Sequence, residues 1–123
     1  MSRLSEEIRG RTKRFASGII RLYCALPKQR EEVKVVGRQL LRAGTSVAAH
    51  AREASRARSD AEFCSKIEGL LQEADESQLW LELLSEDCGI ADPAVAKLNA
   101  ETMEFIGLFT TMAGKIRRRL NES

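Results

Sequence analysis

The sequence predicts an all-α protein, an antiparallel four-helix bundle with up-down-up-down topology. Two observations lead to this prediction. Apolar residues recur at alternating steps of three and four along four successive segments, which is the spacing of one face of a helix. Stretches with proline, glycine or capping residues separate these segments, and none of the segments alternates as a strand does. A length of 123 residues suits one domain spanning residues 1–123.

The first two helices are predicted at about residues 9–26 and 31–58. Pro27 ends the first helix, because the residue before a proline is pushed out of the α region. The inward stripe of the first helix is Thr12, Phe15, Ile19, Leu22 and Leu26. The inward stripe of the second helix is Val33, Val36, Leu40, Ala43, Val47, His50, Ala54 and Ala57.

The third helix is predicted at about residues 60–88, and the fourth begins at residue 93 and frays in the last residues, RRRLNES. Ser59 and Glu62 have the spacing of a capping box. Gly89 suits the left-handed position after a helix, while Asp92 and Pro93 suit the N-cap and the first helical position. The two inward stripes are Phe63, Ile67, Leu70, Ala74, Ser77, Leu81 and Leu84, then Val95, Leu98, Thr102, Phe105, Phe109, Met112 and Ile116.

Composition indicates a cytoplasmic protein. No apolar run approaches the 18 residues of a membrane span, and the N-terminal residues lack the apolar core of a signal peptide. The cysteines are an odd number without a CxxC pair, and we expect Cys24, Cys64 and Cys88 to be buried thiols. The single histidine, His50, has no nearby partner with which to bind a metal.

Charge is distributed in blocks. Residues 1–58 carry 14 Lys and Arg against 5 Asp and Glu, a net charge of +9. Residues 59–104 carry 2 against 12, a net charge of −10, and residues 105–123 carry 4 against 1, a net charge of +3. Either the basic and acidic helices neutralise each other, within or between subunits, or the basic half is free for an anionic partner.

Two helices have more apolar surface than a monomeric bundle needs. In LWLELL, residues 79–84, apolar side chains surround the third helix. The second helix has a second file beside its core stripe, formed mostly by small residues that let another helix approach closely: Gly37, Leu41, Gly44, Ala48 and Ala51. We expect self-association, although a wide monomer core is the alternative. The candidate packing residues are Gly44, Ala48, Ala51, Leu79, Trp80 and Leu83.

A third face of the second helix is basic. Arg38, Arg42, Arg52 and Arg56 recur there at helical spacing and could neutralise several phosphates of a nucleic acid. Arg58, Arg117, Arg118 and Arg119 could extend this surface. The alternative is structural: acidic residues of the third helix, Glu73 and Glu76 among them, would pair with the arginines. No aromatic residues are interleaved with the arginines, so binding would involve the backbone rather than base stacking.

Catalysis is not expected. The chain has no Cys–His or Ser–His spacing, no metal cluster and no phosphate-binding glycine loop, so we expect neither enzyme activity nor a cofactor or bound metal. The Glu-x-x-His motif of carboxylate metal sites in bundles is also missing from the sequence. His50 is interpreted as a hydrogen-bonded structural histidine.

Two stretches carry a resemblance to a known family. LRAGTSVAAHAREASRARSDAEF and LLQEADESQLWLELL resemble the bacterial four-helix-bundle proteins encoded in intervening sequences of 23S ribosomal RNA genes. The matching residues are Leu41 to Ser46, Glu53, Ala54, Ala57, Ser59, Glu62, Phe63, Glu73, Ala74, Glu76, Ser77 and Trp80 to Leu84. The family usually has Asn where this chain has His50, so we expect the polar network at that position to differ.

The resemblance implies a four-helix bundle that assembles as a ring-like homopentamer. The related accessory variability proteins of diversity-generating retroelements are also pentameric bundles, and they bind nucleic acid and a reverse transcriptase. The GTS and LWLELL motifs place this chain nearer the ribosomal branch, for which the resemblance implies no biochemical role. We therefore expect a non-enzymatic homo-oligomeric scaffold that binds the backbone of RNA or DNA. The alternative is a protein-binding adaptor whose arginines form structural ion pairs.

Overall fold

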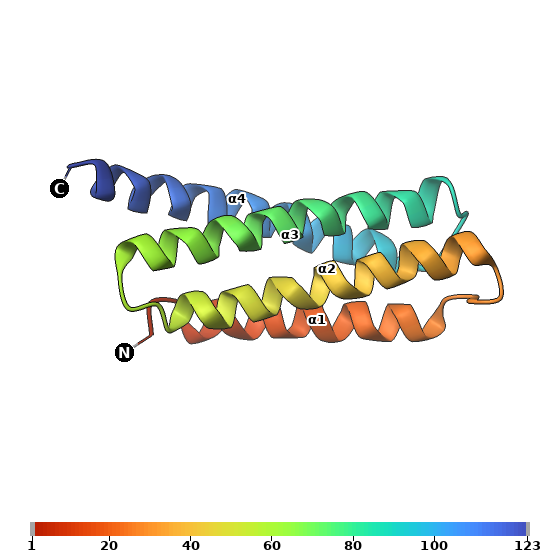
Figure 1. The fold of residues 1–123 in the computed structure, drawn as a ribbon. Coiled ribbons are helices and arrows are strands. Elements are labelled where there is room, and N and C mark those ends of the chain that lie inside the picture. The colour runs from red at the N-terminus through yellow and green to blue at the C-terminus, as the bar shows by residue number, and fades with distance from the viewer. Residues whose placement is uncertain (1, 123) are drawn as a thin grey trace.

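The computed structural model describes residues 2–122, which form four α-helices in up-down-up-down order (Figure 1). The helices are α1 (Glu6–Ala25), α2 (Glu31–Ser55), α3 (Asp60–Glu86) and α4 (Pro93–Glu122). The predicted all-α, four-helix architecture is confirmed. One end of the bundle gathers the start of α1, the end of α2, the start of α3 and the end of α4 (Figure 1).

Capping residues set the helix boundaries. The Ser59 hydroxyl accepts a hydrogen bond of 3.1 Å from the Glu62 N–H, and the Asp92 carboxylate accepts one of 2.9 Å from the Ala94 N–H. Gly89 has a φ of 65°, as expected for the residue that ends a helix. Ser5 also caps a helix, through a bond of 3.1 Å from the Ile8 N–H, so α1 begins earlier than predicted.

The end of α4 differs from the sequence prediction. We expected the last residues to fray, but α4 continues to Glu122. Ile116 is buried, and Arg117 and Arg119 form ion pairs with Glu68 and Asp60 of α3, so the last turns have partners on a neighbouring helix. These contacts join residues far apart in sequence, and periodicity alone does not reveal them.

The core follows the inward stripes of all four helices. Phe15 of α1 meets Phe105 of α4 edge to face, with ring centroids 5.4 Å apart. The largest fully buried side chains are Phe105, Phe109, Ile19, Leu40, Ile67, Leu70, Leu81 and Leu84. Among the neighbouring helices, α2 and α3 pack most extensively, whereas α1 and α4 pack least. The bundle is therefore more open along the side where α1 lies next to α4.

Glycines of α2 bring α1 close. A Cβ added at Gly44 would lie 2.7 Å from Cγ1 of Ile19, and one added at Gly37 would lie 2.9 Å from Cδ1 of Leu26. Both positions are buried between helices of the same chain. The small-residue file predicted on α2 thus packs, at these glycines, inside the bundle, and it places α1 and α2 side by side in a fixed register.

Candidate nucleic-acid interface

The arginines predicted as one basic file on α2 fall into separate groups. Arg42, in the middle of the helix, faces α3: its Nη1 lies 3.2 Å from Glu73 Oε2 and its Nη2 lies 2.7 Å from Glu76 Oε1. The hydrogen bond to Glu76 is the main cause that raises the pKa of this guanidinium. Arg42 therefore forms the structural ion pair that the alternative interpretation predicted.

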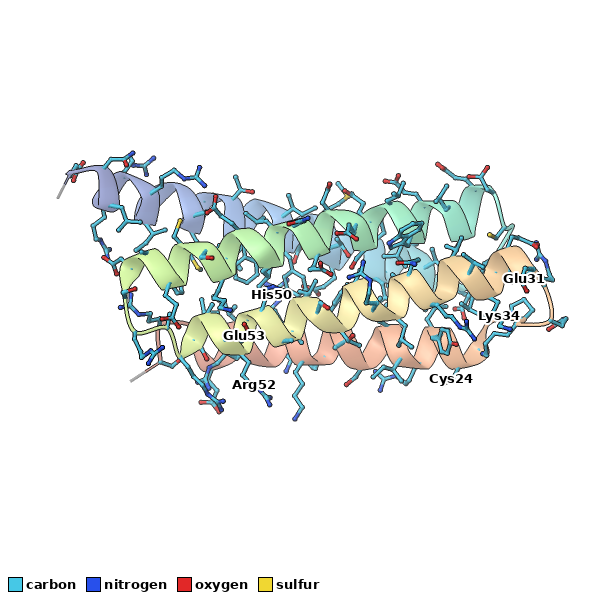
Figure 2. The ribbon with its side chains drawn as sticks, viewed as in Figure 1. Cys24, Glu31, Lys34, His50, Arg52 and Glu53 are labelled. Carbon is cyan, nitrogen blue, oxygen red and sulfur yellow. The ribbon has the colours of Figure 1, made fainter. Side chains whose placement is uncertain are left out.

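Arg52 and Arg56 lie at the far end of α2, where they border a groove of about 920 Å³. Arg52 is in the last turn and Arg56 is the C-cap residue. Figure 2 shows Arg52 at the end of the bundle where α1 begins. Within residues 2–122, neither side chain forms an ion pair or a hydrogen bond. We call this site the basic groove; it is lined by Arg9, Thr12, Lys13, Ala48, Ala49, Arg52, Glu53, Ser55, Arg56, Glu62 and Lys66.

Helix α1 supplies two more cations, Arg9 and Lys13, to the opposite wall of the basic groove. Within the described residues these side chains also lack an ion pair or a hydrogen bond. Neither residue was predicted to belong to the site. Their spacing of four residues indicates that they share one face of α1. Only the register of α1 against α2, however, brings that face beside Arg52 and Arg56. The groove thus gathers four uncompensated positive charges from two helices.

Two carboxylates also line the basic groove, but each has a cation of its own. Glu53 Oε2 lies 2.6 Å from Lys66 Nζ, and this hydrogen bond is the main cause that lowers the pKa of Glu53. Glu62 Oε2 lies 3.7 Å from Arg58 Nε. An anion that enters the groove would therefore meet four free cations and two carboxylates that are already engaged.

The remaining predicted cations do not form one continuous surface with the groove. Arg117 is paired with Glu68, and Arg119 Nη1 lies 3.6 Å from Asp60 Oδ2. Arg38 and Arg118 are exposed and have no ion pair within residues 2–122. Arg38 lies 14 residues before Arg52, which is about 21 Å along the helix at 1.5 Å per residue. Of the cations predicted to extend the basic surface, Arg58, Arg117 and Arg119 are therefore engaged in ion pairs.

A second groove, of about 850 Å³, lies on the other side of α1, next to α4. We call it the α1/α4 groove. Arg11, which lines it, binds both Glu101 and Glu104 of α4. The hydrogen bond with Glu101 is the main cause that raises the pKa of Arg11. Arg14 and Arg21 also line this groove, together with Lys97, Glu7 and Asp92 and an apolar floor that includes Phe15, Leu22 and Leu98.

The candidate packing residues are found in two settings. Gly44 and Ala51 are buried between helices of one chain, and Ala48 is half-buried in the basic groove. On α3, Leu79 is 46% exposed, whereas Trp80 and Leu83 are half-buried. The Nε1 atom of Trp80 is buried and has no hydrogen-bond partner among the described residues.

His50 and two of the three cysteines are packed against other residues of the bundle. The Nδ1 atom of His50 lies 2.9 Å from the Ser46 carbonyl oxygen, to which it donates, and a Cβ added at Gly69 would lie 2.7 Å from Cδ2 of the ring. His50 is thus half-buried between α2 and α3 rather than inside the core. Burial raises the pKa values of Cys64 and Cys88. The expectation of a buried Cys24 was wrong: it lies outside the inward stripe of α1 and is exposed.

Two further observations concern the described residues 2–122. No three His, Cys, Asp or Glu side chains come together there in a way that could hold a metal ion. None of the four helices combines the length and the apolar character that a membrane span requires.

Comparison with known proteins points to one family. The family model described as 23S rRNA-intervening sequence protein matches residues 6–110, a range that contains every residue of the basic groove. Among solved structures, the chain is similar to a protein of unknown function from the S23 ribosomal protein family of Bacteroides thetaiotaomicron. The two are 32% identical over 86% of this chain and 97% of that chain, with a TM-score of 0.78. A search among curated proteins finds no match.

Proposed function

We propose that this chain, which belongs to the 23S rRNA-intervening sequence protein family, is a non-enzymatic scaffold that assembles with copies of itself and binds the backbone of RNA or DNA. The basic groove carries the proposal. Arg9, Lys13, Arg52 and Arg56 surround it without ion pairs in the described chain, which leaves them available to phosphates.

The non-enzymatic part of the proposal is supported by the state of the reactive side chains. The thiols of Cys64 and Cys88 are buried and their pKa values are raised, which disfavours the nucleophilic thiolate. His50 donates its Nδ1 hydrogen to a backbone carbonyl and packs against Gly69, as a structural histidine does. These two thiols and the His50 imidazole are thus engaged in packing or in a backbone hydrogen bond.

Self-association is supported by the apolar side of α3. Leu79 is about half exposed beside Trp80, whose buried Nε1 lacks a partner within residues 2–122. Contact with another subunit would cover the exposed part of Leu79. We propose the ring-like homopentamer that the family resemblance implies, and with it the relation to the retroelement accessory proteins. A ring would repeat the basic groove, so weak phosphate contacts would add by avidity.

The proposal is tested by the mass of the protein in solution, measured by light scattering at low and high salt, with and without a structured ribosomal RNA fragment. We expect a multiple of the subunit mass that gains RNA at low salt and loses it as salt rises, because phosphate contacts release counterions. The adaptor alternative predicts no RNA binding at any salt concentration. A monomer would contradict the assembly, and a complex that is insensitive to salt would contradict the phosphate contacts.

Charge-neutral variants test the groove itself. We expect the double variant Arg52→Gln, Arg56→Gln to bind RNA at least tenfold more weakly with unchanged assembly. Arg42→Gln is the matched control, since it removes a cation from the same helix that is already paired with Glu73 and Glu76. It should retain RNA binding. Equal losses in both proteins would contradict a role specific to the groove.

A further inference from the structure

Along the basic groove, the four cations without ion pairs in the described chain come alternately from α1 and α2, which we call its two walls; Glu62 and Lys66 of α3 border it as well. Helices α1 and α2 run antiparallel, and Ile19 lies opposite Gly44. By this register Lys13 stands level with residue 50 of α2, and Arg9 stands level with residue 54. The order along the groove is therefore Lys13, Arg52, Arg9 and Arg56, at intervals of about 3 Å and over a total of about 9 Å, given a rise of 1.5 Å per residue.

The floor of the groove offers little for a base to bind. It contains the methyl groups of Ala48 and Ala49 and two hydroxyls, of Thr12 and Ser55. The Thr12 hydroxyl donates to the Arg9 carbonyl at 2.9 Å, and the Ser55 hydroxyl donates to the Arg52 carbonyl at 2.7 Å. None of the lining residues, all within the described range 2–122, is aromatic. Stacking on an aromatic ring and donation of a hydroxyl hydrogen to a base edge are thus unavailable at the floor.

We propose that the basic groove binds a single nucleic-acid strand with its phosphates turned inward between the two walls and its bases turned out to solvent. This inference rests on the proposed function and specifies how the groove acts. A run of about two to three consecutive phosphates fits four alternating cations over this length. It also explains why the site needs no aromatic residues, since the bases do not enter it.

The spacing favours a nucleic-acid strand over other phosphate chains. On each wall the two cations are four residues apart, about 6 Å along the helix axis. Successive phosphates of a nucleic acid are separated by a sugar and lie several ångströms apart. Neighbouring phosphates of inorganic polyphosphate share an oxygen and lie closer together. A single strand can also rotate its phosphates toward both walls, whereas a duplex fixes their orientation.

The experiment measures the binding of fluorescent ten-nucleotide strands by anisotropy. The salt concentration is varied between 50 and 300 mM, because phosphate contacts make the affinity depend on salt. The probes are oligothymidylate, an abasic strand of the same length, a matched duplex, and oligothymidylate with a neutral methylphosphonate backbone. We expect the abasic strand to bind within about threefold of oligothymidylate. The neutral strand should bind at least tenfold more weakly, because the contacts require charged phosphates. The duplex should also bind at least tenfold more weakly, because it fixes the orientation of its phosphates and cannot turn them toward both walls.

The variants separate the two walls. Arg9→Gln, Lys13→Gln removes the α1 wall. The matched control Arg14→Gln, Arg21→Gln removes two cations of α1 that line the α1/α4 groove instead and have no ion pair within residues 2–122. We expect the first variant to lose at least tenfold in affinity and to flatten the salt slope by about 1.4, at about 0.7 per phosphate contact of a single strand. The control should lose less than threefold. Circular dichroism checks that both variants are folded.

The outcomes distinguish this inference from the proposed function. If no strand or duplex binds to the wild-type protein at low salt, the proposed function fails, and the inference with it. If Arg52→Gln, Arg56→Gln abolishes binding while Arg9→Gln, Lys13→Gln leaves it intact, nucleic-acid binding stands and the two-walled arrangement is wrong. Tighter binding of the duplex, or a tenfold loss with the abasic strand, would also overturn the inference alone.

Discussion

Helix α1 borders two grooves of similar size, and both contain arginines, but the two grooves differ in what faces those arginines. In the α1/α4 groove, Arg11 is held by Glu101 and Glu104 from α4. In the basic groove, Arg9 and Lys13 lie beside the cations of α2, and the two carboxylates there, Glu53 and Glu62, have other cations as partners. The number of arginines does not decide whether a surface can take a phosphate. The residues that the neighbouring helix places opposite them decide it.

The largest expected effect comes from separating α1 from α2. The change Gly44→Ala adds a Cβ 2.7 Å from Cγ1 of Ile19, so the helices must move apart. We expect the free energy of unfolding to fall by about 1–3 kcal/mol, as for other overpacked cores, and strand binding to weaken with it. Urea denaturation measures the first effect and anisotropy the second.

Gly107→Ala is the control for this prediction. A Cβ at Gly107 meets nothing within 4 Å inside the chain. Alanine is the better helix former, so this change should raise the free energy of unfolding by about 0.5–1 kcal/mol. Similar shifts in the two variants would show that Gly44 does not set the distance between α1 and α2.

A smaller effect is expected from making the two grooves alike. The double variant Glu101→Gln, Glu104→Gln frees Arg11 and leaves the α1/α4 groove with an excess of cations. We expect strand affinity at low salt to rise several-fold, and the gain to vanish when Arg11→Gln is added. Glu82→Gln, Glu86→Gln on α3 controls for net charge. An equal gain in that control would mean that overall charge, rather than the groove, is responsible.

Lys66 offers a finer test, because it holds the carboxylate of Glu53 at 2.6 Å. The change Lys66→Gln would release Glu53, which would then compete with phosphate for the cations of the basic groove. We expect a two- to threefold loss of strand affinity in the anisotropy assay. Adding Glu53→Gln removes the competing carboxylate and should restore binding. The double variant has the same net charge as the wild type. No recovery would show that Lys66 itself contacts the strand.

The smallest effect concerns pH. Hydrogen bonds from Arg3 and from Lys66 are the main causes that lower the pKa values of Asp60 and Glu53, respectively. Carboxylates with lowered pKa values contribute stability above their unfolded pKa values, about 3.9 and 4.3, and this contribution is lost as the pH falls through the folded values. The urea midpoint should therefore stay level from pH 7 to 5 and decline below about pH 4. Arg3→Gln should make this decline shallower; an unchanged decline would contradict the role of Asp60.

Much of the fold could be predicted because its signals are local. The inward stripes, the cap at Ser59, the start at Asp92 and Pro93, and the left-handed Gly89 all depend on neighbours within a few residues. The start of α1 was missed because its first turn, Glu6 and Glu7, is polar and precedes the apolar stripe.

The site was predictable only in part. Arg52 and Arg56 were visible as a helical file, but Arg42 has the same spacing and a different role. Whether an arginine is free depends on the register of the adjacent helix, which the one-dimensional pattern does not contain. For the same reason Arg9 and Lys13 were not predicted, although their spacing of four residues can be seen in the sequence.

The basic groove lies where α2 ends and α1 begins, and this position determines how the helix dipoles act on a bound strand. The last turn of α2 carries the negative end of its helix dipole, which stabilises Arg52 and Arg56 without attracting an anion. At the positive end of α1, Glu6 and Glu7 offset the dipole. Side chains alone must then supply the attraction. Because the Debye length at physiological salt is about 8 Å, close to the length of the groove, ionic strength should set the residence time of the strand.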